Sequence, residues 1–126
     1  MLKCDKLSIT IAGRTLVREL SLELGSGEVI CMLGPNGVGK TLALHTLAGL
    51  LTPASGVVML DGEDISELGR RQIARRLGLL LQDDAESFPA TVLDTVLMGR
   101  HPYMTALGSA SAADHALADQ ALAAMD

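Results

Sequence analysis

Aromatic side chains are nearly absent from this sequence, which has no tryptophan and only two rings, Phe88 and Tyr103, among its 126 residues. Proteins that bind single-stranded nucleic acids rely on such rings as stacking platforms. Positive charge is also scarce, because 10 Lys and Arg residues stand against 15 Asp and Glu residues and the formal net charge is -5. Since phosphate backbones select basic surfaces, the composition argues against a nucleic acid as the principal partner. Any anion site must therefore be local.

Long apolar runs and paired cysteines are missing as well. No stretch of about 18 apolar residues occurs, which excludes a transmembrane helix, and the charges near the N-terminus do not fit a signal peptide. Cys4 and Cys31 lack ligand-like spacing and are predicted to be reduced, buried side chains of a cytosolic protein. The histidines share no metal-ligand spacing and form no nucleophilic triad, so we expect surface or helix-end positions for His45, His101 and His115.

Residues 34–41 read Gly-Pro-Asn-Gly-Val-Gly-Lys-Thr and match the phosphate-binding pattern G-x-x-x-x-G-K-[ST]. Such a loop follows a buried strand and opens a helix. Residues 29–33 form a continuous apolar run, as expected of a central strand in a parallel sheet, and apolar residues recur at helical spacing over 44–51. The alternative is a glycine-rich turn with a solvated lysine. Strand, loop and helix agree in order, which favours the phosphate site.

The residue types of this loop suit a nucleoside triphosphate. Its glycines let the backbone curl so that successive N–H groups point inward, where a side chain would block a phosphate. The loop then enters a helix N-terminus, whose free N–H groups favour an anion. Lys40 is placed to reach the terminal phosphates, and the Thr41 hydroxyl to hold Mg2+. The loop residues predicted to bind nucleotide are Gly34, Pro35, Asn36, Gly37, Val38, Gly39, Lys40 and Thr41.

Several further strands are predicted from alternation and apolar runs. Residues 2–11 and 20–24 alternate between apolar and polar, with a turn at 12–14, which indicates a half-buried antiparallel pair. Residues 57–60 form a short apolar strand that ends in an Asp-Gly turn requiring positive φ. Residues 77–81 are a second candidate for a buried strand. These patterns predict an α/β fold with an antiparallel β subsheet followed by a parallel core.

A polar helix is predicted around Ile73 and Ala74, because four arginines three and four residues apart surround them. This spacing is more typical of a solvated helix face than of a phosphate clamp, since it wraps much of the helix. The arginines are Arg70, Arg71, Arg75 and Arg76.

Two capping boxes predict the last helices. Thr91 with Asp94 starts a helix that a His-Pro pair at 101 and 102 stops, and Ser111 with Asp114 starts a final helix. The apolar stripe of that final helix is predicted to be core. Its members are Leu117, Ala121, Leu122 and Met125.

In these features the chain resembles the ATP-hydrolysing subunit of ATP-binding-cassette (ABC) transporters over essentially its whole length. Residues 34–41 match that family's Walker A loop, and Leu80-Leu81-Gln82 is similar to its Q-loop. The resemblance implies a P-loop NTPase fold of ABC type, with residues 1–84 in the nucleotide-binding core and 85–126 at the start of a helical subdomain. The acids at 83 and 84 do not fit a Walker B pair, because Gln82 intervenes before the first acid.

The resemblance also implies ATP and Mg2+ as cofactors. Lys40 and Gln82 carry over as catalytic residues, and Thr41 and Gln82 as contacts to Mg2+. Leu42 completes the nucleotide-binding set through its backbone N–H, although the family commonly has a hydroxyl at this position. Gln82 would also link the nucleotide site to the helical subdomain. Ile11 aligns with the position where the family usually stacks an aromatic ring on adenine.

Residues 91–102 are similar to the importer ATPases for iron-siderophores, haem and cobalamin. The implied partners are an integral membrane permease subunit, a second copy in a homodimer and, indirectly, a substrate-binding protein. The implied location is peripheral, at the cytoplasmic face of the inner or cell membrane. The family's LSGGQ signature, Walker B acid and switch histidine are not in this sequence, so we expect an N-terminal part that is inactive alone. The alternatives are a nucleotide-binding module without hydrolysis and a soluble non-transport ABC ATPase.

Overall fold

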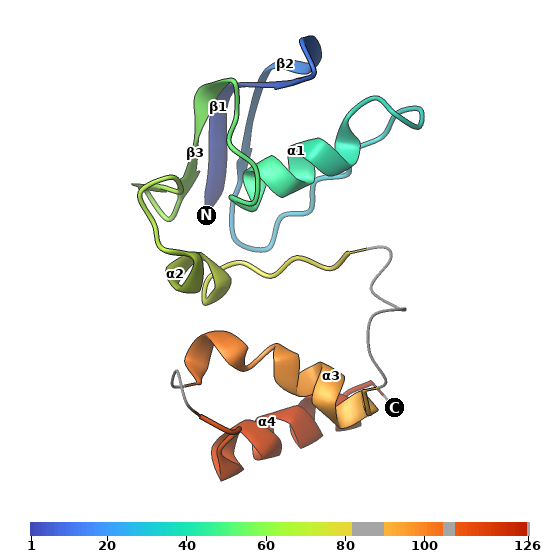
Figure 1. The fold of residues 1–126 in the computed structure, drawn as a ribbon, viewed down its shortest axis with the longest axis vertical. Helices are drawn as coiled ribbons and strands as arrows, with labels where there is room; N and C mark the ends of the chain where they lie inside the picture. Colours follow the sequence, from blue (N-terminus) through green and yellow to red (C-terminus); the bar gives the residue numbers. More distant parts are fainter. Residues whose placement is uncertain (82–89, 105–107, 126) are drawn as a thin grey trace. The chain divides into compact units, whose positions relative to one another are not determined.

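The computed structural model of the chain describes residues 1–81, 90–104 and 108–125. They divide into two compact units, Met1–Gly78 and Leu79–Asp126, and the boundary expected between residues 84 and 85 lies outside the described residues. The first unit contains β1 (Leu2–Ile11), β2 (Arg14–Leu24), α1 (Lys40–Leu47), β3 (Ser55–Leu60), β4 (Glu63–Asp64) and α2 (Arg70–Ala74) (Figure 1). The second contains α3 (Val92–Met98), the 3-10 helix η2 (His101–Tyr103) and α4 (Ala112–Ala123).

The first unit is built on an antiparallel sheet with strand order β2-β1-β3-β4 (Figure 1). β1 lies between β2 and β3, so that Leu2 stands opposite Leu24 on one side and Leu60 on the other. The strands predicted at 2–11, 20–24 and 57–60 are therefore confirmed, with β2 starting earlier than expected.

Two-residue turns close both hairpins of this sheet. Ala12 and Gly13 join β1 to β2 with φ of 48° and 78°, and Asp61 and Gly62 join β3 to β4 with φ of 53° and 87°. Such left-handed pairs match the twist of the strands on either side. The positive φ predicted for the Asp-Gly turn is confirmed.

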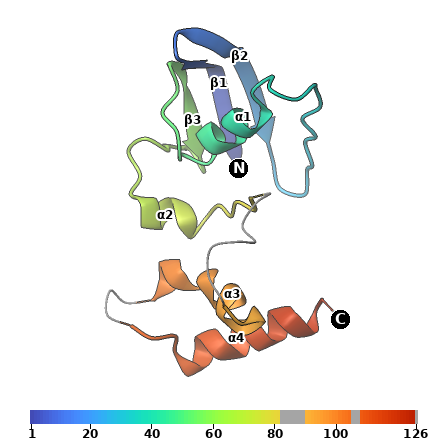
Figure 2. The ribbon, with the colours of Figure 1, turned by 45° about the vertical axis from the view of Figure 1, so that its right-hand side comes forward.

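A cluster of buried apolar side chains holds α1 against the sheet, and α1 lies beside the strands in both views (Figures 1 and 2). Leu7 of β1 is 0% exposed. The cluster consists of Cys4, Leu7, Ile9, Ala43, Leu47, Val58, Leu60, Ile65 and Ile73. Because α1 contributes to this cluster, the sheet also fixes the position of the loop that precedes α1.

The strands predicted at residues 29–33 and 77–81 are not formed, which corrects the sequence interpretation. Val29, Leu33 and Leu80 are 92%, 87% and 94% exposed, and Cys31, predicted to be buried, is exposed as well. An apolar run becomes a central strand only where strands pair along its edges and helices cover its faces. In the described ranges no strand pairs with either run, and the paired strands are all antiparallel.

Helix ends differ in two places from the sequence pattern. α1 ends at Leu47 instead of extending to residue 51, because Gly49 has φ of 71° and turns the chain away. α3 ends at Met98 rather than at the pair His101-Pro102, which instead begins η2. No helix within the described ranges combines the length and apolar character needed to cross a membrane.

The prediction that the apolar stripe of α4 is buried is wrong for three of its four members, since Leu117, Ala121 and Met125 are all exposed. Leu117 is 46% and Met125 is 84% exposed, whereas α4 buries Asp114 and Ala118. Residues four apart lie on one face of a helix, so the buried face follows 114 and 118 and the stripe that starts at 117 lies about 100° around the axis. Leu122, four residues after Ala118, is half-buried.

Candidate phosphate-binding site

The glycine-rich loop ends where α1 begins. Gly39 is the N-cap residue of α1, with φ of 106° and ψ of 11°, and the first turn of α1 contains no acidic side chain. The first N–H groups of a helix have no partner within the helix, and its N-terminus carries a partial positive charge. This end of α1 is therefore suited to an anion, and no carboxylate of the first turn competes for it.

Two glycines of the loop are required for different reasons. Gly37 has φ of 80°, and nothing lies within 4 Å of the place a Cβ would occupy, so backbone conformation alone favours glycine there. At Gly39 a Cβ would lie 3.3 Å from Leu16 Cβ and 3.3 Å from Val17 Cγ2, both in β2. The end of the loop thus rests directly on the sheet, which limits how far it can move.

Lys40 lies across the loop. Its Nζ donates to the carbonyl oxygen of Gly34 at 2.6 Å and to that of Pro35 at 2.8 Å. Lys40 is the first residue of α1, but these bonds hold its ammonium group beside the first two residues of the loop. Because a lysine has three N–H donors, two bonds to the loop leave one donor for an oxygen of an incoming anion. The sequence pattern predicted where Lys40 would lie but gave no sign of these carbonyl partners.

Among the other residues predicted to bind nucleotide, some side chains are exposed and one packs against the core cluster. Thr41 is exposed in the first turn of α1, where its hydroxyl can accept or donate to a ligand. The Leu42 side chain is half-buried and packs against the core cluster, so only its backbone N–H can serve an anion. Val38 is 43% exposed, and Asn36 is exposed, on the loop itself.

Comparison with known proteins identifies the family. The sequence matches the ABC transporter family over residues 17–126, which include the loop, α1 and all of the second unit. The chain belongs to the ABC transporter family. The P-loop fold of ABC type, expected from the Walker A loop, is thereby confirmed as the fold class.

Several curated relatives of this ABC protein are named as ATP-binding proteins of import or transport systems. A hemin import ATP-binding protein of Rhizobium meliloti is 37% identical over 126 residues, which are 100% of this chain and 47% of the relative. A cobalamin import ATP-binding protein of Halobacterium salinarum is 35% identical over 117 residues, 93% of this chain and 29% of the relative. A ferric enterobactin transport ATP-binding protein of Escherichia coli is 38% identical over 102 residues, 81% and 38% respectively. The chain thus spans half or less of the length of these relatives.

Solved structures support the same fold. An inward-facing structure of a putative metal-chelate type ABC transporter has a TM-score of 0.78 at 25% identity and covers 98% of this chain and 44% of that one. A dimeric ATP-binding cassette in a post-hydrolysis state with ADP and Pi has a TM-score of 0.75 at 21% identity, with coverage of 98% and 55%. The second likeness concerns the fold alone.

The arrangement of the loop fits the phosphates of ATP, whereas only some of the other predicted contacts of this ABC site lie within the described residues. The open backbone at Gly37, the Lys40 ammonium and the start of α1 can together surround a phosphate chain, and the Thr41 hydroxyl offers an oxygen to Mg2+. Gln82 lies outside the described residues. Ile11, at the end of β1, is 46% exposed, which leaves its side chain accessible to an apolar ligand.

Two of the arginines in and beside α2 contact segments other than the loop. Arg70 Nη1 donates to the carbonyl oxygen of Gly49 at 2.9 Å, close to the C-terminal end of α1, and Arg76 forms an ion pair with Glu63. These contacts tie α2 to neighbouring segments of the first unit. For Arg70 and Arg76 they agree with a structural role and not with a phosphate clamp. Among the described residues, no group of three or more His, Cys, Asp or Glu side chains could hold a metal ion.

Proposed function

We propose that this chain is the ATP-binding part of an ABC transporter ATPase subunit that energises import of a substrate such as an iron-siderophore, haem or cobalamin. The observation that carries the proposal is the position of Lys40, whose ammonium group lies across the glycine loop at the uncapped start of α1. The family match supports ATP as the ligand. The names of the relatives support the substrate class, because they give hemin import, cobalamin import and ferric enterobactin transport.

In this proposal, different residues of the loop would contact the phosphates of ATP and the Mg2+ ion. The Lys40 ammonium would contact the terminal phosphates and stabilise negative charge there, and the Thr41 hydroxyl would be a ligand of Mg2+. The backbone N–H groups of residues 34–42 would surround the phosphates. Gln82 would contact Mg2+ and orient the attacking water. In the complete subunit these groups would serve hydrolysis of ATP, whereas the 126 residues alone lack the LSGGQ signature and a Walker B acid and would turn over ATP negligibly.

Nucleotide titration of the purified chain tests the proposal. We expect binding of Mg-ATP, and we expect Lys40→Ala to weaken it about tenfold or more, because a charge-assisted bond to phosphate is lost. Lys3→Ala is the matched control, since Lys3 is an exposed lysine paired with Glu23 in the sheet. Equal affinity for ATP in the Lys40→Ala variant and the unchanged chain would overturn the proposal. Turnover that is robust and is abolished by Lys40→Ala would overturn only the expected inactivity of the chain alone.

The proposed partners are an integral membrane permease subunit, a second copy of the subunit and, indirectly, a substrate-binding protein. The proposed location is the cytoplasmic face of the inner or cell membrane, where a permease would hold the subunit. Copurification of the chain with a permease from detergent-solubilised membranes tests this part. Recovery in the soluble fraction alone, with ATP still bound, would favour a non-transport ABC ATPase or a nucleotide-binding module without hydrolysis.

A further inference from the structure

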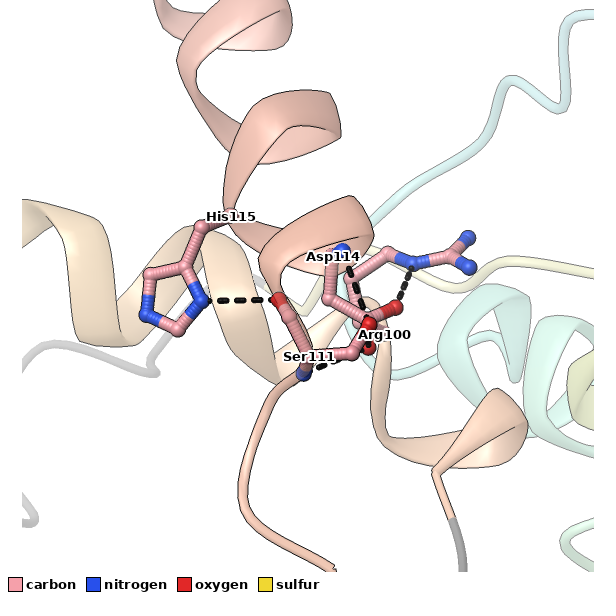
Figure 3. Close-up of polar contacts among 4 residues, drawn as sticks. All are labelled: Arg100, Ser111, Asp114 and His115. Carbon is pink, nitrogen blue, oxygen red and sulfur yellow. Dashed lines mark hydrogen bonds and ion pairs between the residues drawn. The ribbon is translucent and has the colours of Figure 1, made fainter.

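Asp114 is the only charged side chain that is buried within the described residues, with 9% exposure. Its carboxylate accepts hydrogen bonds from the Ser111 N–H at 3.0 Å, from the Ser111 hydroxyl at 2.6 Å and from Arg100 Nε at 2.9 Å (Figure 3). The Arg100 guanidinium carbon lies 4.2 Å from the centroid of the Tyr103 ring. A polar chain therefore runs from the start of α4 to the turn that follows α3.

Apolar packing in the second unit is thin by comparison. α3 buries none of its residues, and α4 buries only Ala118 beside Asp114. The apolar side chains of α3 are half-buried at best. A small side chain such as alanine offers little shape for a neighbouring helix to fit, so several alignments of the two helices would pack about equally well.

The ion pair distinguishes between those alignments. One turn before and one turn after Asp114 lie Ala110 and Ala118, neither of which can accept a bond from a guanidinium through its side chain. A slip of one turn would therefore separate Arg100 from its carboxylate. Asp114 would then be buried without a counter-charge, which is strongly unfavourable.

We propose that the pair formed by Arg100 and Asp114 is a register lock, which selects a single alignment of α3 and α4 and thereby positions η2 and Tyr103 beside the start of α4. Fixing register is the best-attested use of a buried ionic group, because such a pair adds geometric selection more reliably than net stability. Tyr103 is 45% exposed, so the lock orients an accessible ring. Presentation of that surface to a permease rests on the function proposed above, whereas the lock itself does not.

Amide NMR spectra of the nucleotide-free 126-residue chain test the lock. In the double variant Arg100→Met/Asp114→Leu the pair is replaced by apolar side chains of similar size. We expect α3 and α4 to remain helical by circular dichroism, while the amides of residues 92–104 and 108–123 show more than one set of signals. The unchanged chain should give one set. One sharp set in the double variant, with the same contacts between the two helices, would overturn the proposal.

Two further variants separate the lock from ordinary stabilisation. Asp94→Leu removes the same capping-box bonds from α3, but Asp94 has no ion pair in the described part of the chain, so one set of signals is expected. Asp114→Glu keeps the charge and should also give one set. Loss of the α3 and α4 helices in Arg100→Met/Asp114→Leu would assign the pair to stability and refute the lock, as would multiple sets in Asp94→Leu. Because no nucleotide is present, failure here is distinct from failure to bind ATP.

Discussion

The first unit is held by apolar burial and the second by a polar contact. Nine side chains form the cluster between the sheet and α1, whereas the described part of the second unit buries one alanine and the carboxylate paired with Arg100. Apolar burial stabilises in proportion to the area removed from water and prefers no direction. A partly buried ion pair such as that of Arg100 and Asp114 adds little net stability but favours one geometry. The first unit thus gains stability from area, and the second gains alignment from a single bond.

This difference matters for the phosphate loop, because the loop belongs to the unit with the core. α1 contributes Ala43 and Leu47 to the cluster, and Gly39 lies against β2. The anion site is therefore attached to the most rigidly packed part of the chain, as preorganised electrostatic sites require. The second unit carries no such core in its described residues, so its surface depends on whatever fixes α3 against α4.

The largest effects are expected in the first unit, and one of them lies where β3 passes close to the backbone of β1. Gly56 has φ of +85°, and a Cβ there would lie 2.5 Å from the Lys6 carbonyl oxygen and 2.6 Å from that of Asp5. Backbone atoms cannot move aside as a side chain can, so Gly56→Ala should lower the free energy of unfolding by about 3 kcal/mol. Urea unfolding followed by circular dichroism measures this.

Gly13→Ala is the matched control for that substitution. Gly13 has φ of +78°, but nothing lies within 4 Å of its Cβ position, so only the backbone strain of about 1 kcal/mol should appear. Equal losses for the two variants would mean that β1 and β3 separate readily at Gly56, and that the sheet is less rigid than its register indicates.

The second prediction compares one leucine from each unit. Leu7 is 0% exposed in the core, and Leu7→Ala should lower the free energy of unfolding by about 3 kcal/mol, because it leaves a cavity. Leu117 of α4 is 46% exposed, and Leu117→Ala should change it by no more than about 0.5 kcal/mol. Thermal unfolding of both variants provides the measurement. A large loss at Leu117 would reveal a partner for the exposed stripe of α4.

The third prediction concerns acid. Hydrogen bonds from the Ser111 hydroxyl and from Arg100 lower the pKa of Asp114 to about 2. An unfolded aspartate titrates near about 3.9, so the stabilisation that Asp114 provides is complete above about pH 4 and is lost as the pH falls toward 2. The free energy of unfolding of the unchanged chain should therefore decrease modestly over that interval while α3 and α4 stay helical, as measured by urea unfolding followed by far-UV circular dichroism.

Two variants identify the group responsible for that acid transition. Asp114→Asn cannot titrate and should lose less of that free energy between pH 4 and 2 than the unchanged chain does. Asp94→Asn removes the corresponding carboxylate of α3, whose pKa is lowered by its bonds to Thr91 but which has no arginine among its described partners. Its acid profile should stay closer to that of the unchanged chain. An identical profile in Asp114→Asn would contradict a role for this carboxylate.

Short-range patterns in the sequence predicted the positions of most helices, strands and turns. Both capping boxes predicted their helices, because Thr91 and Asp94, or Ser111 and Asp114, are three residues apart and interact within one turn. The Asp-Gly turn and the loop glycines were equally local. In contrast, the contact between Arg100 and Asp114 spans 14 residues and depends on how two helices align. No pattern within a single element encodes that contact.

For the phosphate site, too, the sequence predicted the local features and not the contacts between residues distant along the loop. The pattern around Lys40 located the anion site, but the bonds from its ammonium group to the Gly34 and Pro35 carbonyls depend on the curvature of the loop in space. At residues 29–33 the local pattern predicted a buried strand that the structure does not form. A continuous apolar run indicates a buried strand only if other strands lie beside it, and that condition is not written within the run itself.

The smallest expected effect is a difference in chemical reactivity between the two cysteines, without loss of stability. It tests directly whether residues 29–33 are buried. Cys4 is buried, and burial raises the pKa of its thiol, so little thiolate is present and access is poor. Cys31, within residues 29–33, is exposed. Iodoacetamide at about pH 8 should therefore modify Cys31 rapidly and Cys4 only after unfolding in urea, as read by mass spectrometry of tryptic peptides. Protection of Cys31 equal to that of Cys4 would mean that the run is covered, as its apolar pattern predicts, and that the strand entering the phosphate loop belongs to the interior.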